Sequence, residues 1–231
     1  MGIGKKMVGG MATKVAPQFA HAAPGVTSRA VLEALDRAID GVGPLKPAAV
    51  AAEKQLEEQG GDVVKAIREV IENNVALSGG QGFVTNLGGL ATAAVAMPAN
   101  VVGLAVIQCR MIAGIAHLRG HDLSDPRVRN GVLAALLGNE GVDELIKRKK
   151  LPGSPLALAT ARVHDPDLRT FLATEVGAFM VSKVAGKRLV SVAGRRIPVV
   201  GGVVGASADG YSTWRAGRYA DKEFTPPRKR R

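Results

Sequence analysis

The sequence contains little of what builds disulfides, aromatic anchors or β-sheets. Cys109 is the only cysteine among 231 residues, which excludes an intrachain disulfide and favours a reducing compartment. Eight residues are aromatic (five Phe, two Tyr and one Trp), so the core must rely on aliphatic side chains and on close backbone approach at some of the 29 glycines. No segment alternates β-branched and polar residues as a half-buried strand does. The sequence therefore predicts an all-α fold.

Acidic residues are also scarce relative to basic ones. Lys and Arg number 31 against 20 Asp and Glu, which gives a formal net charge of +11. Such a balance favours an anionic partner, either a membrane surface or a nucleic acid, with a solvated surface of dispersed charge as the plain alternative. Nucleic acid is the weaker interpretation, because the chain has no recognition motif and almost no aromatic residues for base stacking.

Motifs for common catalytic and targeting roles are missing as well. The sequence has no G-x-S-x-G nucleophile motif, and Gly186-Lys187-Arg188 lacks the earlier glycine and the Ser or Thr of a P-loop. Near the N-terminus, only seven uncharged residues, two of them glycine, separate Lys6 from Lys14, which is a poor secretory signal. Without such a signal we expect a cytoplasmic protein. Its excess of basic residues leads us to expect peripheral attachment to the inner face of the cell membrane.

What is present is a series of helix patterns and helix starts. Asp125-Pro126 and Asp165-Pro166 each place a capping carboxylate before a first-turn proline. We expect about eight helices in one compact domain over residues 26–224. A Gly/Ala-rich segment at 1–25 precedes this domain, and a basic tail at 225–231 follows it. Helical periodicity is found at 28–40, 48–59, 63–77, 82–97, 100–118, 127–138, 139–150, 167–187 and 198–224.

The longest uncharged run of the chain, residues 73–109, predicts a central apolar αα-hairpin. Its two arms, 82–97 and 100–118, meet at Pro98, which suits the first turn of the second arm. A membrane span needs ~20 mainly apolar residues without a charge at its centre. The first arm is short and glycine-rich, and the second contains Arg110. A pair of spans is therefore the alternative, and a hairpin buried in a helical body is the prediction.

Arg110 lies on a polar line of the second arm. Helical spacing of 100° per residue places Asn100, Arg110 and His117 in one sector. A buried guanidinium needs a counter-charge, because an unpaired buried charge costs ~3–5 kcal/mol. The last helix has a face of small residues that includes Asp209. We predict that Arg110 pairs with Asp209, with Glu175 as the second candidate, and that the pair fixes helix register.

Two blocks of this sequence resemble the EcsC protein family. They are "GFVTNLGGLATAAVAMPANVVGLAVIQCRMIAGIAHLRGHDLSDPRVR" and "IPVVGGVVGASADGYSTWRAGRYADKEF", and the likeness covers residues 28–224. The family is named after a protein encoded beside an ABC transporter, so the resemblance implies an ABC transporter as a candidate partner. It supports the hairpin and supplies no agreed catalytic residues. The matching positions, interpreted as framework, are Phe83, Gly88, Gly89, Pro98, Arg110, Gly120, Asp125, Gly201, Gly202, Asp209 and Arg218.

Candidates for metal binding and nucleophilic chemistry are weak. His117, His121, Asp122 and His164 are the residues that a metal would use if their turns met. Their loose spacing is far less diagnostic than an H-E-x-x-H helix. Cys109 lies in an apolar helix, which favours a structural thiol. We expect no cofactor and no resident metal.

Membrane-surface binding accounts for more of these features than any reaction does. We predict an accessory or binding protein that is attracted to anionic lipid through its basic clusters. The alternative is an enzyme, such as a metal-assisted hydrolase, with a polar site along Asn100, Arg110, His117 and Asp209. The predicted lipid-binding residues are Lys147, Arg148, Lys149, Lys150, Arg195, Arg196, Arg228, Lys229, Arg230 and Arg231.

Overall fold

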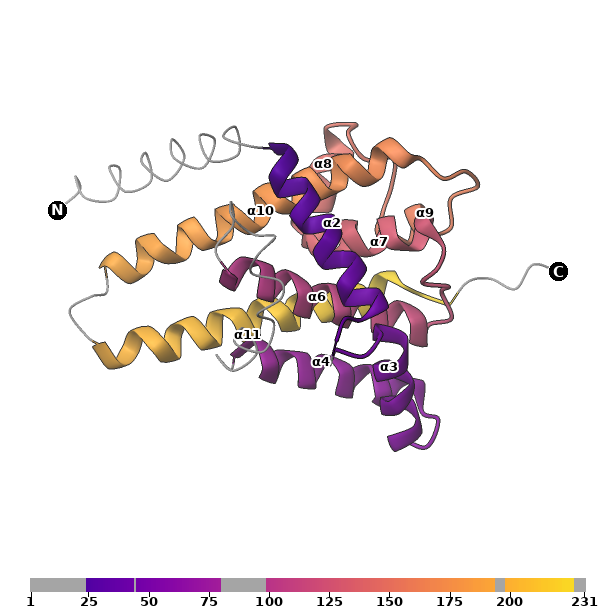
Figure 1. Ribbon diagram of the computed structural model, residues 1–231, viewed down its shortest axis with the longest axis horizontal. Coiled ribbons are helices and arrows are strands. Elements are labelled where there is room, and N and C mark those ends of the chain that lie inside the picture. Colours follow the sequence, from indigo (N-terminus) through magenta and orange to yellow (C-terminus); the bar gives the residue numbers. More distant parts are fainter. Residues whose placement is uncertain (1–23, 44, 80–98, 194–197, 227–231) are drawn as a thin grey trace.

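The computed structural model describes residues 24–43, 45–79, 99–193 and 198–226. Within these ranges the chain forms nine helices and no β-strand, which confirms the predicted all-α fold (Figure 1). The helices are α2 (Pro24–Asp40), α3 (Ala48–Glu58), α4 (Val63–Gly79), α6 (Ala99–Leu118), α7 (Pro126–Leu136), α8 (Gly138–Lys147), α9 (Pro155–Ala159), α10 (Pro166–Ala193) and α11 (Pro198–Glu223).

Carboxylates cap three helices, and two of them belong to the Asp-Pro pairs that the sequence indicates. Asp125 accepts a hydrogen bond from the Arg127 amide at the start of α7. Asp165 accepts from the amides of the first turn of α10, and Asp62 does the same for α4. These bonds satisfy amides that have no partner within the helix. The sequence therefore located these starts correctly.

The helix α2 begins earlier than the predicted range 28–40, for which Thr27 or Ser28 is the expected N-terminal cap. It starts at Pro24, because a proline is readily accommodated in a first helical turn. Ser28 is instead a buried residue within α2, and its hydroxyl lies 2.7 Å from the Thr174 hydroxyl of α10. Ser28 thus links α2 to α10 and does not cap the start of α2.

The helix α6 occupies the centre of the fold. It packs against α2, α3, α4, α7 and α11, which surround it (Figure 1). Val106, Ile112 and Ile115 are completely buried within this ring of helices. The second arm of the predicted hairpin is therefore confirmed as a buried helix. The first arm, 82–97, lies outside the described residues.

An ionic network joins three helices around this core. The Arg129 guanidinium of α7 contacts Asp36 at 3.0 Å and Asp40 at 2.6 Å, both on α2. Arg169 of α10 contacts Asp36 at 2.7 Å. Only 16% of the Arg129 side chain is exposed, so this network has more geometric restraint than an isolated surface pair.

One end of the molecule is formed by the long helices. The C-terminal part of α10 and the N-terminal part of α11 extend beyond the other helices, to the left in Figure 1. We call residues 183–193 and 198–208 the arm. The ends of α4 and α6 that flank residues 80–98 point toward the same side (Figure 1). Among the described residues, no helix combines the length and apolar character that a bilayer crossing requires.

A glycine permits the close contact between α7 and α9. A methyl group at Gly131 would lie 2.7 Å from the Pro155 carbonyl oxygen and 3.2 Å from the Ala159 side chain. Because the methyl group would meet a backbone oxygen, which cannot move aside as a flexible side chain does, we expect a cost of ~2–3 kcal/mol, in the upper part of the usual range for overpacking. This cost exceeds the ~1 kcal/mol that replacing glycine by alanine contributes to helix stability. We expect Gly131→Ala to lower the free energy of unfolding by ~1–2 kcal/mol in urea denaturation.

Gly114→Ala is the matched control. Its methyl group would make an ordinary contact of 3.4 Å with the Ala52 side chain on α3. We expect this variant to be as stable as the wild type or slightly more stable. Equal stability of the two variants would contradict the close α7–α9 contact.

Candidate functional site

The helices α6 and α11 are packed together and run in the same direction. Nε2 of Gln108 lies 3.3 Å from the Thr213 hydroxyl, and the two residues are 105 positions apart in sequence. Arg119, just after α6, forms an ion pair with Asp221 at 2.5 Å, a separation of 102 positions. The nearly constant separation fixes the register of the two helices.

This register contradicts the predicted Arg110–Asp209 pair. Arg110 follows Gln108 by two residues, ~200° around the helix, so it faces away from α11. Its guanidinium donates to the backbone carbonyl of Lys46 in the α2–α3 connection. Burial lowers the pKa of Arg110, and within the described residues it forms no ion pair. The carboxylate that α11 provides to the end of α6 is Asp221, and its partner is Arg119.

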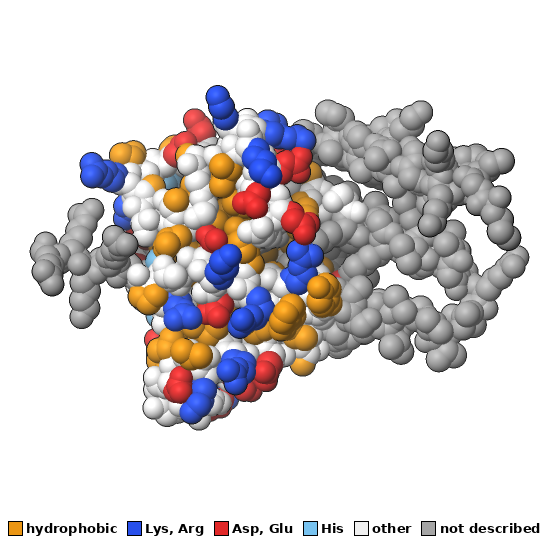
Figure 2. All heavy atoms as spheres, turned by 180° about the vertical axis from the view of Figure 1, so that it is seen from behind, with side chains coloured by type: hydrophobic (Ala, Val, Ile, Leu, Met, Phe, Trp, Pro, Cys, Tyr) orange, Lys and Arg blue, Asp and Glu red, His pale blue; other side chains and the backbone are white. Residues whose placement is uncertain are grey.

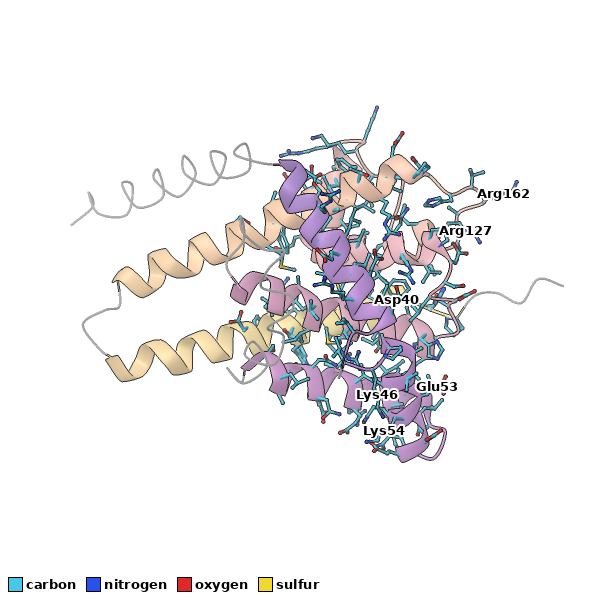
Figure 3. All side chains as sticks on the ribbon, in the orientation of Figure 1. Asp40, Lys46, Glu53, Lys54, Arg127 and Arg162 are labelled. Atoms are coloured by element: carbon cyan, nitrogen blue, oxygen red, sulfur yellow. The ribbon has the colours of Figure 1, made fainter. Side chains whose placement is uncertain are left out.

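The residues proposed for an enzyme are distributed over different faces. His117 shares the α3 side of α6 with Arg110, and its Nε2 lies 2.6 Å from Glu53 Oε1. Figure 3 shows Glu53 near Lys46 on this side of the molecule. Asp209 belongs to α11, and the Asn100 side chain lies outside the described part. Arg110 and His117 are thus brought together without Asp209.

The candidate metal ligands have separate partners. Nε2 of His121 donates to the Thr225 carbonyl at 2.9 Å. Asp122 accepts hydrogen bonds from the Ser124 hydroxyl and amide, and these bonds lower the pKa of its carboxyl group. His164 Nδ1 is buried and has no hydrogen-bond partner among the described residues. Within those residues, no three His, Cys, Asp or Glu side chains are grouped to hold a metal.

Cys109 has the environment of a structural thiol. Its side chain is completely buried in α6. Burial raises the pKa of this thiol strongly, because the thiolate would lose its hydration. Since the thiolate is the reactive form, the side chain is a poor nucleophile in the folded protein.

The predicted lipid-binding residues are divided by the structure. Lys147, Arg148, Lys149 and Lys150 are all exposed where α8 ends, and Arg148 forms an ion pair with Glu144. The remaining predicted residues, at 195–196 and 228–231, lie outside the described ranges. The four basic side chains at the end of α8 are therefore accessible from solvent, as binding to a lipid surface requires.

A pocket of about 470 Å³ opens between α11, the α7–α8 junction and α10. We call it the α8–α11 pocket. Its volume lies within the ~300–1,000 Å³ that is usual for small-molecule sites. Four of the eight aromatic residues of the chain line it, namely Phe179, Tyr211, Trp214 and Tyr219. Sequence reasoning missed this site, although three of these residues within nine positions, in a chain so poor in aromatics, were a usable signal.

Charged side chains border the α8–α11 pocket. Arg215 of α11 pairs with Glu140 of α8 at 2.9 Å, and hydrogen bonding to that carboxylate raises the pKa of Arg215. Arg218 lies 3.8 Å from Asp221, at the limit of an ion pair. Burial raises the pKa of the Tyr219 phenol, which indicates a poorly hydrated environment on this side.

Comparison with known proteins identifies the family. The model of the EcsC protein family matches residues 5–230, nearly the whole chain. The chain belongs to the EcsC protein family. No curated protein and no solved structure gives a match.

The residues that carried the EcsC resemblance have two kinds of position. Gly120 follows α6 with a φ of +86°, a conformation that favours glycine at a helix end. Asp125 caps α7, so both are framework residues. Arg218 lines the α8–α11 pocket. Phe83, Gly88 and Gly89 lie outside the described residues.

Two double-mutant cycles test the α6–α11 register. Because Arg119 and Asp221 are in contact, we expect Arg119→Ala and Asp221→Ala to be coupled by ~0.5–1 kcal/mol in the free energy of unfolding. Arg110→Ala and Asp209→Ala are the matched pair, and their effects should add within ~0.3 kcal/mol. Coupling between Arg110 and Asp209 as large as that between Arg119 and Asp221 would restore the original prediction.

Proposed function

We propose that this EcsC protein is a cytoplasmic accessory protein that binds reversibly to anionic membrane surfaces. The observation that supports the proposal is the distribution of charge along the chain. Residues 24–79, 99–175 and 209–226 contain 19 basic residues and all 20 acidic residues, so this helical body has a net charge of −1. The whole excess of positive charge belongs to other segments.

These segments contain basic residues but no Asp or Glu. Residues 176–208, which include the arm, contain five basic residues, residues 1–23 contain three, and residues 227–231 contain four. The surface of the body in Figure 2 has acidic and basic side chains interspersed, as its charge balance requires. Solubility alone does not require the excess positive charge of a protein to be confined to a few segments of its chain.

Apolar sequence accompanies the basic residues of the arm. Residues 198–208 of α11 contain no charge, and neither do residues 80–98, whose flanking helices point to the same side (Figure 1). Basic side chains beside apolar segments are typical of proteins that attach to a bilayer surface without crossing it. The arm is therefore the part of the protein that we assign to the membrane.

The expected strength of attachment is modest. Each basic residue near an anionic surface contributes ~1 kcal/mol, so the five of residues 176–208 give at most ~5 kcal/mol. Screening limits this attraction to ~10 Å at physiological salt. Such binding is reversible and depends on salt. Lys147–Lys150 belongs to the neutral body, so we assign it the smaller contribution.

Flotation with vesicles of phosphatidylglycerol and phosphatidylcholine tests the proposal. We expect the protein to float with anionic vesicles at low salt, and to remain unbound with neutral vesicles or at high salt. Arg195→Gln/Arg196→Gln should weaken binding ~30-fold, the equivalent of two contributions of ~1 kcal/mol.

Lys147→Gln/Lys150→Gln is the control with the same loss of charge. Because these residues belong to the body, we expect less than a threefold change. Equal losses in the two double variants would show that net charge, and not the position of the basic residues within 176–208, directs binding. If the wild-type protein does not float with anionic vesicles at low salt, the proposed membrane binding is contradicted.

A further inference from the structure

The α8–α11 pocket has an apolar floor and a polar rim. Leu136, Leu137 and Ala216 line it and are at most 8% exposed. They come from the α7–α8 junction and from α11, so the floor joins two parts of the chain about 80 residues apart. A strongly polar ligand would leave its donors and acceptors unpaired against these side chains. The floor is therefore suited to a hydrocarbon group.

Aromatic and cationic side chains form the rim. The rings of Tyr211 and Trp214 stack with centroids 6.0 Å apart, and they are 62% and 47% exposed. Aromatic side chains with a polar atom favour the boundary between apolar and aqueous surroundings. Arg215 and Arg218 lie one helical turn apart beside them, and both side chains are more than half exposed. The rim is suited to an anionic group.

Arg215, Arg218 and Glu140 are the charged residues that line the pocket, and the carboxylates of Asp143 and Glu223 act on the Tyr219 phenol from outside this lining. Glu140 compensates Arg215 at 2.9 Å, whereas Arg218 is 3.8 Å from Asp221, a carboxylate that already contacts Arg119 at 2.5 Å. The contact of Arg218 with Asp221 is therefore weaker than that of Arg119 with the same carboxylate. Its guanidinium can turn toward an anionic headgroup at a small energetic cost, because an exposed ion pair contributes only ~0.2–1 kcal/mol.

We propose that the α8–α11 pocket binds one single-chain anionic amphiphile, with its alkyl chain against Leu136, Leu137 and Ala216 and its headgroup at Arg218. The pocket begins 13 residues along α11 from Pro198, ~20 Å from the tip of the arm. This site is thus distinct from the membrane contact proposed above. It takes a dissolved molecule and requires no bilayer.

Trp214 makes binding directly measurable, because it is the only tryptophan of the chain and lies on the rim. We expect dodecyl phosphate, titrated below its critical micelle concentration, to change the Trp214 emission saturably and to shift it to the blue. Inorganic phosphate tests the headgroup alone, and dodecyl maltoside tests the chain without a charge. Both should bind at least tenfold more weakly than dodecyl phosphate.

Each outcome decides a part of the proposal. No saturable change with dodecyl phosphate would overturn it. If dodecyl maltoside binds as strongly as dodecyl phosphate, the pocket does not require an anionic headgroup. If inorganic phosphate binds as strongly, the pocket does not require an alkyl chain. Because no vesicles are present, these results are independent of whether the protein floats with membranes.

A pair of arginine variants locates the headgroup. Arg218→Gln should raise the Kd for dodecyl phosphate about tenfold, which corresponds to one charge-assisted hydrogen bond. Arg162→Gln is the matched control, since Arg162 is exposed between α9 and α10 and does not line the pocket (Figure 3). Thermal melting checks that both variants are folded. An unchanged Kd for Arg218→Gln, or an equal increase for Arg162→Gln, would overturn the assignment.

Discussion

The enclosure of α6 is the constraint on which the rest of the structure depends. A helix that is apolar over most of its surface is stable in water only when other helices cover it, and five of them do so here. The one polar side chain buried at its α11 face, Gln108, is directed toward hydroxyl groups of Ser212 and Thr213. Arg110, on the α3 side of α6, and Arg119, just after its last residue, are both bonded to oxygen atoms.

The positive charge is distributed unevenly between the body and the rest of the chain. Side chains of the body meet across helix interfaces, and their charges compensate one another in pairs such as Arg129 with Asp40 and Arg119 with Asp221. The arm extends beyond the helices that this network joins (Figure 1). The excess of positive charge belongs to residues outside the body, and in the function proposed above an anionic surface supplies its counter-charge. The α8–α11 pocket belongs to the body and is a separate recognition element.

The sequence allowed the helices to be predicted, because their signals are local. A capping carboxylate, the proline that follows it and the first-turn amides lie within four residues, and this pattern predicts the starts of α7 and α10. Apolar periodicity predicts α6. The orientation of Arg110 could not be predicted in the same way. It depends on which neighbour covers each face of α6 and on the α6–α11 register, and these are decided by residues 64 and 105 positions away in the sequence. The pocket was missed for the same reason, since Phe179 and Leu137 meet α11 only after folding.

Hydrogen–deuterium exchange of the protein, free and bound to phosphatidylglycerol vesicles, tests most directly the claim that a neutral body holds a basic, apolar membrane-binding end. The account predicts that α6 exchanges slowest in both states, and that vesicles slow exchange in residues 80–98 and 183–208 while leaving α7 and α8 unchanged. Slowed exchange across α7 and α8, with none in the arm, would contradict it.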